Sequence, residues 1–164
     1  MRKRHQVVIV GGGPVGVALA VELGRRGISC ALVERRLAPQ RVPKGQGLTQ
    51  RSMEHFYAWG VADKVRAARL LPPEFPTSGI TAYRNLMSEY WYAPQVREIV
   101  NRYYFQESER LPQYLTEEVL RARMAELSEV ESAFGWAAQT VEQDDRGARV
   151  TIAKEDSDER MTLE

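Results

Sequence analysis

The chain has 164 residues, of which 43% are hydrophobic and 27% are charged, as is typical of one globular domain that buries a sizeable core. A disordered tail and a coiled rod are excluded. The 23 basic and 22 acidic residues leave a formal net charge of +1, which gives no reason to expect binding to nucleic acid or an anionic membrane. The single cysteine, Cys30, and two histidines provide neither an internal disulfide nor a metal-ligand cluster. We expect a cytoplasmic protein without zinc and without a membrane span.

The first 34 residues follow the pattern of a strand, a helix and a second strand. Residues 6–10 are a β-branched run without polar alternation, as expected of a strand covered on both faces. Apolar residues recur at helical spacing over 15–26, and Gly27 is placed to end that helix. A second strand is expected over 29–34. Together these elements predict a βαβ unit with a right-handed crossover.

The middle of the chain predicts short elements separated by loops. Residues 38–44 are expected to form an extended loop, and helices are expected over 49–58 and 61–68. The aromatic-rich stretch 79–105 predicts two or three short strands outside the βαβ unit. Its rings form either the core of a small sheet or part of a substrate-binding region.

The last third predicts one helix and a run of strands. The helix is expected over 116–127 with Thr116 as its N-cap. Residues 130–134 are then expected to extend the parallel sheet. An antiparallel meander follows, with strands expected over 136–142, 148–154 and from 160 onward, the first two joined by a hairpin turn at 144–147. The fold class is therefore α/β, with a parallel sheet and an antiparallel β-meander.

The motif with chemical content is the G-x-G-x-x-G of Gly11, Gly13 and Gly16, which directly follows the first strand. Gly11 permits a tight turn, Gly13 lets a pyrophosphate approach the backbone, and Gly16 lets the helix pack closely. The helix N-terminus offers free N–H groups to phosphates. Glu34, which closes the second strand, is placed to accept hydrogen bonds from a ribose diol, favouring NAD or FAD over NADP. The alternative is a glycine-rich turn that binds nothing.

Further blocks of sequence carry a resemblance to a known family. These blocks are residues 8–16, 33–35, 43–48, 51–54 and 59–61, and Leu111-Pro112-Gln113 followed by Glu117 and Leu120. In them the chain resembles the FAD-dependent aromatic hydroxylases, which are class A flavoprotein monooxygenases of the para-hydroxybenzoate hydroxylase and polyketide hydroxylase type. The resemblance implies FAD as cofactor, NAD(P)H as reductant and a small aromatic substrate that is hydroxylated with O2.

The resemblance also implies which residues bind the cofactor. They are Gly11, Gly13, Pro14, Val15, Gly16, Glu34, Arg35, Lys44, Gly47, Arg51 and Gln113. It places Arg35 beside the adenine, Lys44 where many members have an arginine that reaches the phosphates and ribitol, and Gln113 on the ribityl chain. The alternatives are solvated charges for Lys44 and Arg51 and a helix-capping amide for Gln113. No residue is assigned a catalytic role, because the flavin carries the chemistry.

Members of this family are far longer, so we expect an incomplete, N-terminal part of such an enzyme. Residues 1–77 are expected to form the FAD-binding βαβ unit and flavin-contacting helix, 78–106 a stub of the substrate domain, and 107–164 the return to the FAD-binding domain. A missing C-terminal half is then a partner, and the chain alone is expected to be inactive. The alternatives are a module that binds FAD or ADP without catalysis, and a halogenase or reductase of the same superfamily.

Overall fold

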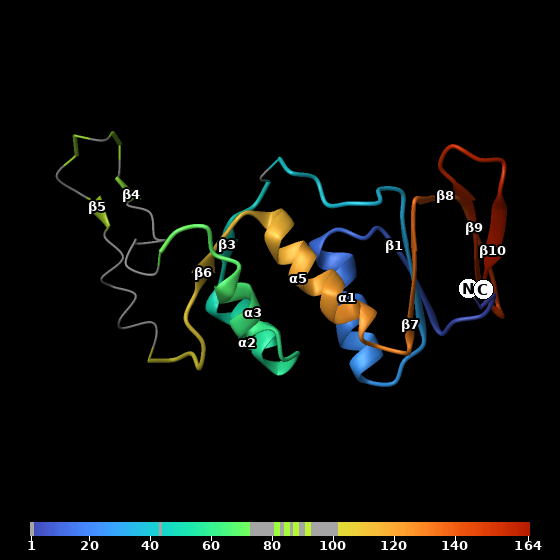
Figure 1. The fold of residues 1–164 in the computed structure, drawn as a ribbon, viewed down its shortest axis with the longest axis horizontal. Coiled ribbons are helices and arrows are strands. Elements are labelled where there is room, and N and C mark those ends of the chain that lie inside the picture. Colours follow the sequence, from blue (N-terminus) through green and yellow to red (C-terminus); the bar gives the residue numbers. More distant parts are fainter. Residues whose placement is uncertain are drawn as a thin grey trace. The chain divides into compact units, whose positions relative to one another are not determined.

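A computed structural model describes residues 2–42, 44–72, 81–82, 84–85, 87–88, 91–92 and 102–164. The chain divides into two compact units. One is formed by residues 1–43 together with 113–164, and the other by residues 44–112. Figure 1 labels the helices and strands of each unit.

The first unit is built on a three-stranded parallel sheet. Its strands are β1 (Val7–Val10), β2 (Cys30–Glu34) and β7 (Val130–Phe134), in the order β1-β2-β7. The helix α1 (Pro14–Arg25) connects β1 to β2. The predicted βαβ unit and the predicted extension of the sheet by 130–134 are both confirmed. β1 lies at the edge of the sheet, and Val10 in it is 56% exposed.

The central strand β2 is buried on both faces. Cys30 lies opposite Val7 on one side and Val130 on the other. Ala31 and Val33 belong to the core shared with the meander. Because side chains alternate along a strand, Cys30 and Leu32 face the helices. This two-sided burial explains why the sequence of β2 shows no polar alternation.

Two helices cover one face of the sheet. α1 ends where Gly27 adopts a positive φ of +75°, as predicted. The second helix, α5 (Gln113–Ala125), buries Leu120 and Met124. The predicted start of this helix is wrong: Thr116 is not its N-cap but a buried residue inside it, and the Thr116 hydroxyl makes no hydrogen bond. The helix starts at Gln113, directly after Pro112, because a proline disfavours the helical conformation of the residue before it, here Leu111.

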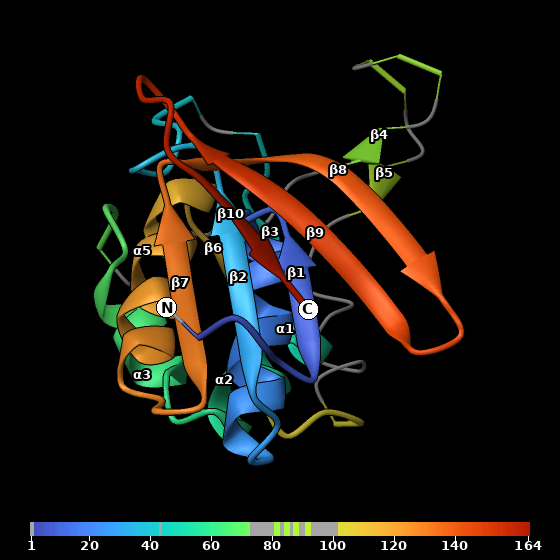
Figure 2. The same ribbon diagram turned by 90° about the vertical axis from the view of Figure 1, so that its right-hand side faces the viewer.

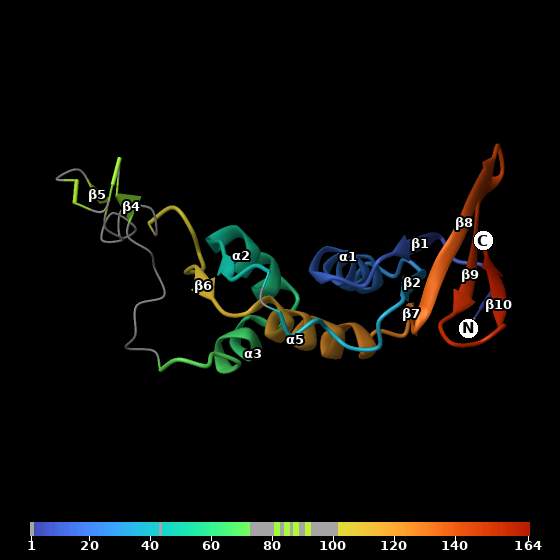
Figure 3. The same ribbon diagram turned by 90° about the horizontal axis from the view of Figure 1, so that it is seen from above.

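The other face of the sheet is covered by the predicted antiparallel meander of β8 (Trp136–Asp144), β9 (Gly147–Lys154) and β10 (Arg160–Leu163). Figure 2 shows these strands in front of the parallel sheet, and Figure 3 shows α1 and α5 on the opposite side. Val150, Ile152 and Leu163 form the buried core with residues of the sheet. The first unit therefore has three layers: helices, parallel sheet and meander.

The start of the chain runs beside the end of β10. The His5 N–H donates to the Glu164 carbonyl at 2.7 Å, and the Glu164 N–H donates to the Lys3 carbonyl at 2.7 Å. A salt bridge of 3.0 Å joins Arg4 to Glu164. These contacts hold the segment Lys3–His5 against the end of β10.

The second unit holds short elements. β3 (Gly47–Leu48) pairs antiparallel with β6 (Glu109–Arg110), and the predicted helices are present as α2 (Gln50–Ala58) and α3 (Ala62–Ala67). The Thr49 hydroxyl accepts a hydrogen bond of 3.2 Å from the Ser52 N–H and caps α2.

Part of the predicted aromatic-rich region can be placed in this unit. β4 (Thr81–Ala82) and β5 (Trp91–Tyr92) pair antiparallel. Phe105 is exposed and meets the ring of Tyr57 edge-on, with centroids 4.8 Å apart. Tyr103 and Tyr104 of this region are also exposed. Tyr83, Tyr90 and residues 93–101 lie outside the described residues.

Candidate functional site

The three glycines of the motif occupy the turn between β1 and α1, and each meets a different steric condition. Gly11 has a φ of +110°, which L side chains rarely adopt. A Cβ at Gly16 would lie 1.9 Å from the Gly11 carbonyl oxygen, whereas a Cβ at Gly13 would meet nothing within 4 Å. The geometry agrees with a tight turn at Gly11 and close packing at Gly16. It also leaves open space at Gly13, where the pyrophosphate is predicted to approach.

A fourth glycine, Gly12, is equally constrained, and the motif gave no reason to single it out. A Cβ there would lie 2.7 Å from the Cβ of Glu34. The Gly12 N–H donates a hydrogen bond of 2.7 Å to Oε2 of Glu34. The signal in the sequence was the unbroken run Gly11-Gly12-Gly13, in which the middle residue had no assigned role.

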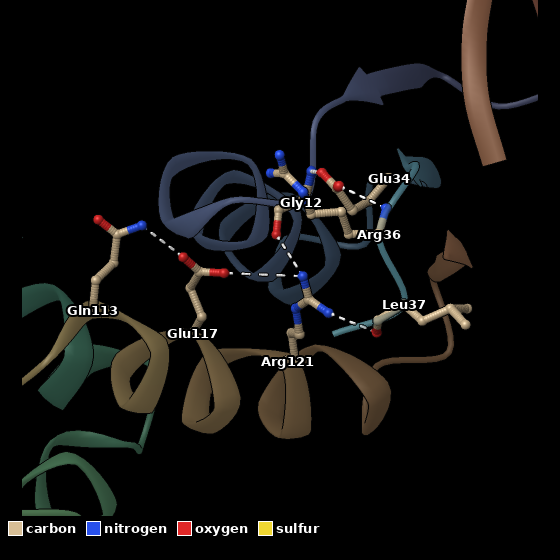
Figure 4. A network of polar contacts seen from close by, with 7 residues as sticks. All are labelled: Gly12, Glu34, Arg36, Leu37, Gln113, Glu117 and Arg121. Atoms are coloured by element: carbon tan, nitrogen blue, oxygen red, sulfur yellow. Dashed lines mark hydrogen bonds and ion pairs between the residues drawn. The ribbon is translucent and has the colours of Figure 1, made fainter. Parts of the chain in front are cut away.

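Glu34 closes β2 with its carboxylate beside the glycine turn (Figure 4). Its second oxygen, Oε1, accepts a hydrogen bond of 2.9 Å from the Arg36 N–H. A carboxylate has about four acceptor positions, so two remain for the hydroxyls of a ribose. The predicted neighbour Arg35 is exposed.

The N-terminus of α1 is suited to an anion. Gly13 is the N-cap and provides no side-chain cap, Pro14 has no N–H, and the first turn contains no acidic residue. The N–H groups of Val15 and Gly16 lie in the first turn, where a helix has no acceptors for them. The partial positive charge at this end is therefore unopposed within its own turn.

Arg121 of α5 reaches the same glycine turn, and sequence analysis missed it. Its Nη2 donates to the Gly12 carbonyl at 3.2 Å and its Nη1 to the Leu37 carbonyl at 3.1 Å. Its guanidinium carbon lies 4.3 Å from the centre of the Phe134 ring. Burial lowers the pKa of Arg121, and the nearby carboxylates of Glu117, Glu34 and Glu118 oppose that shift. The side chain is only 14% exposed, so this is an interior contact.

Gln113, the predicted ribityl contact, joins the same network. Its Nε2 donates to Oε1 of Glu117 at 2.7 Å, and Oε2 of Glu117 lies 3.9 Å from Nη2 of Arg121. Figure 4 shows the resulting series of polar contacts from Gln113 to Glu34 through Glu117, Arg121 and Gly12. The spacing of four residues between Gln113, Glu117 and Arg121 was a readable signal, because such residues share one helix face.

The remaining predicted residues, Lys44, Gly47 and Arg51, belong to the second unit. All three are exposed. Arg51 forms a salt bridge of 3.0 Å with Glu54, whose other oxygen accepts a hydrogen bond of 3.1 Å from the Phe105 N–H. The hydrogen bond from Arg51, followed by that from the Phe105 N–H, lowers the pKa of Glu54.

The described part of the chain contains neither a membrane-spanning helix nor a cluster of metal ligands. Among those residues, no helix combines the length and apolar character needed to cross a bilayer. Within the same ranges, His, Cys, Asp and Glu form no group of three that would hold a metal ion.

Comparison with known proteins assigns the chain to a family. Residues 4–164 match the family described as FAD binding domain, and the chain belongs to it. It is 32% identical over 159 residues to the 3-(3-hydroxy-phenyl)propionate/3-hydroxycinnamic acid hydroxylase 2 of Burkholderia vietnamiensis, covering 96% of this chain and 27% of that protein. It is 28% identical over 166 residues to the FAD-dependent monooxygenase apdD of Emericella nidulans, covering 93% of this chain and 26% of that protein. The chain thus spans about a quarter of the length of these relatives.

Solved structures agree with this assignment. The flavin-dependent monooxygenase PieE, crystallised with FAD and substrate, superposes with a TM-score of 0.79 at 25% identity, covering 98% of this chain and 28% of that one. The p-nitrophenol 4-monooxygenase PnpA from Pseudomonas putida DLL-E4 shares the fold, with a TM-score of 0.78 at 21% identity over 99% of this chain and 39% of that one. The predicted α/β fold and the predicted FAD cofactor are confirmed. The open space at Gly13, the uncapped end of α1 and the two remaining acceptor positions of Glu34 fit such a group.

Proposed function

We propose that the glycine turn, the N-terminus of α1 and Glu34 bind the ADP half of FAD in a flavin-dependent monooxygenase. That enzyme would hydroxylate a small aromatic substrate with NAD(P)H and O2. The names of the relatives support the reaction class: the Burkholderia vietnamiensis protein is a hydroxylase of hydroxyphenylpropionate and hydroxycinnamic acid. When bound, the flavin supplies the redox chemistry that links reductant to oxygen.

The observation that carries the proposal is the open space at Gly13 beside an uncapped helix end. Free N–H groups and the helix dipole stabilise the negative pyrophosphate there. Glu34 orients the ribose through the acceptor positions that the backbone leaves free, and Arg35 lies beside the adenine. The protein part of the chemistry is thus binding and orientation.

The other proposed contacts lie on the flavin side. Gln113 would hold the ribityl chain through its amide, which Glu117 already orients at 2.7 Å. Two of the residues, Lys44 and Arg51, would contribute positive charge toward the phosphates and the flavin. At Gly47 the backbone itself would approach the cofactor. Lys44 offers a single point charge, whereas an arginine offers a fork that bonds twice.

The binding proposal is tested by titrating FAD into the purified chain and following flavin fluorescence, with ADP as competitor. We expect saturable FAD binding that ADP displaces. The absence of binding for both ligands in folded protein would refute the proposal. Binding that ADP does not displace would refute the assignment of the glycine turn to the ADP half.

The reaction is tested on the complete gene product that contains this chain. We expect NAD(P)H oxidation that is stimulated by hydroxylated phenylpropanoids or polycyclic phenols and is coupled to a product with one additional oxygen. FAD binding without any such turnover across the panel would favour the alternative of a binding module or another flavoenzyme of the superfamily.

A further inference from the structure

We propose that Arg121 is a positioning residue for the pyrophosphate of FAD, and that it acts by fixing the orientation of the peptide between Gly12 and Gly13. This inference rests on the proposed function, because it takes the glycine turn to bind the ADP half. Arg121 lies on α5, far along the chain from that turn.

The first step is the geometry of the guanidinium. Two of its nitrogens donate to two carbonyls from different loops, Gly12 after β1 and Leu37 after β2, at 3.2 and 3.1 Å. The Phe134 ring and the Glu117 carboxylate hold the group from two further directions, at 4.3 and 3.9 Å. A buried guanidinium with these four contacts has one orientation, so it acts as a fixed donor toward Gly12.

The second step is the geometry of the peptide. In a trans peptide the C=O and the following N–H point in opposite directions, and among the described residues no peptide bond is cis. Because the Gly12 carbonyl points at Arg121, the Gly13 N–H points away from it. That N–H finds no acceptor within the described ranges, and the space beside Gly13 is open. Arg121 therefore directs a free donor to the side where a pyrophosphate would lie.

The third step is why this orientation needs a clamp. Glycine has the largest backbone freedom of any residue, and the turn contains three in succession. A flipped Gly12–Gly13 peptide would present a carbonyl oxygen, which repels a phosphate. The preceding peptide is already held, since the Gly12 N–H donates to Glu34. Arg121 holds the Gly12–Gly13 peptide through the Gly12 carbonyl. The two peptide bonds that flank Gly12 are therefore fixed by two side chains of opposite charge, Glu34 and Arg121.

The test uses the full chain with Arg121→Met, which keeps an apolar stem against Phe134 but removes both donors, and Arg121→Lys, which keeps the charge and one point of donation. The matched control is Arg123→Met on the same helix, because Arg123 pairs locally with Glu126 at 2.7 Å. ADP affinity is measured by isothermal titration and adenosine affinity by competition. Thermal unfolding without ligand is recorded for every variant.

We expect Arg121→Met to bind ADP at least tenfold more weakly than the parent and adenosine within twofold of it, because adenosine carries no phosphate. The ADP affinity of Arg121→Lys should lie between those of the parent and of Arg121→Met. The ADP affinity of Arg123→Met should match that of the parent within twofold. An equal loss of ADP and adenosine would overturn the inference in favour of a purely structural role. If Arg121→Met does not unfold cooperatively, Arg121→Lys decides: a threefold or greater loss of ADP with adenosine unchanged supports the inference, and a smaller loss overturns it.

The two proposals fail in different ways. A parent chain that folds but binds no ADP refutes the proposed function, and the inference falls with it. A parent that binds ADP, with Arg121→Met binding it within twofold, refutes the role of Arg121 alone.

Discussion

In the glycine turn, Gly16 is needed for stability and Gly13 for cofactor binding. Alanine substitutions at the two positions should therefore affect the Tm and the FAD affinity differently. A Cβ at Gly16 would lie 1.9 Å from a backbone carbonyl oxygen, although real Cβ atoms essentially never come closer than 3.0 Å to such a neighbour. Because that neighbour is backbone, the turn or the helix must move by about 1 Å. A Cβ at Gly13 meets nothing within 4 Å, and its φ of −73° suits an L residue.

The magnitudes follow from these distances. Overpacking costs about 1–3 kcal/mol, and a contact this short with backbone belongs at the upper end. Alanine regains about 1 kcal/mol of helix propensity over glycine, which leaves a net loss of about 2 kcal/mol for Gly16→Ala. For a chain of this size the loss lowers the Tm by about 4–8 °C. Gly13→Ala should keep the Tm of the parent within about 2 °C.

Binding should show the opposite order of effects. In Gly13→Ala the new methyl group occupies the space that a pyrophosphate needs, so we expect FAD to bind at least about tenfold more weakly, equivalent to ~1.4 kcal/mol. Circular dichroism melting and FAD titration measure the two quantities. A Gly16→Ala chain as stable as the parent would refute the steric argument, and a Gly13→Ala chain that binds FAD normally would refute the placement of the pyrophosphate.

Three further predictions concern other parts of the first unit. The Glu34 carboxylate should make 2′-phospho-ADP bind about fivefold or more weakly than ADP, since like-charge repulsion costs roughly 1 kcal/mol at such a site; equal binding in a competitive titration would contradict its role, and Glu34→Gln should remove the discrimination. The edge strand β1 should make the isolated chain self-associate, which size-exclusion chromatography measures. Val10→Lys should reduce this self-association, whereas the control Val42→Lys, at an exposed loop position, should not. A sharp monomer peak for the parent would argue against an aggregation-prone edge. Burial raises the pKa of the Cys30 thiol, so less thiolate is present at neutral pH. The folded chain should therefore resist a thiol reagent until it unfolds. Rapid labelling of the native protein would contradict the burial of Cys30.

What the sequence could predict was local. The strand before the glycines, the helix after them and the meander each have a periodicity within one short window, and each was placed correctly. The proposed binding role of Gly11, Gly13, Gly16 and Glu34 was read from the same kind of window, because the fingerprint lies within one βαβ unit. The structure brings these residues together at the turn after β1.

What the sequence did not predict depends on residues far apart. Arg121 contacts the Gly12 carbonyl across 109 positions of the chain, and no pattern within a window joins the two. Thr116 was misread because a threonine before a helical pattern resembles an N-cap, whereas its burial inside α5 depends on tertiary packing.

The first unit is discontinuous in sequence, and this has a consequence for the time at which the site can form. Residues 1–43 supply the glycine turn, but β7 and Arg121 are made only after the whole second unit. Contacts of such large sequence separation form late, and domains fold as units during synthesis. On the ribosome, the nascent turn therefore lacks its clamp until α5 has emerged, and β2 lacks one neighbour until β7 follows. The site should become competent to capture its nucleotide only after α5 and β7 have been translated, whatever the supply of free FAD.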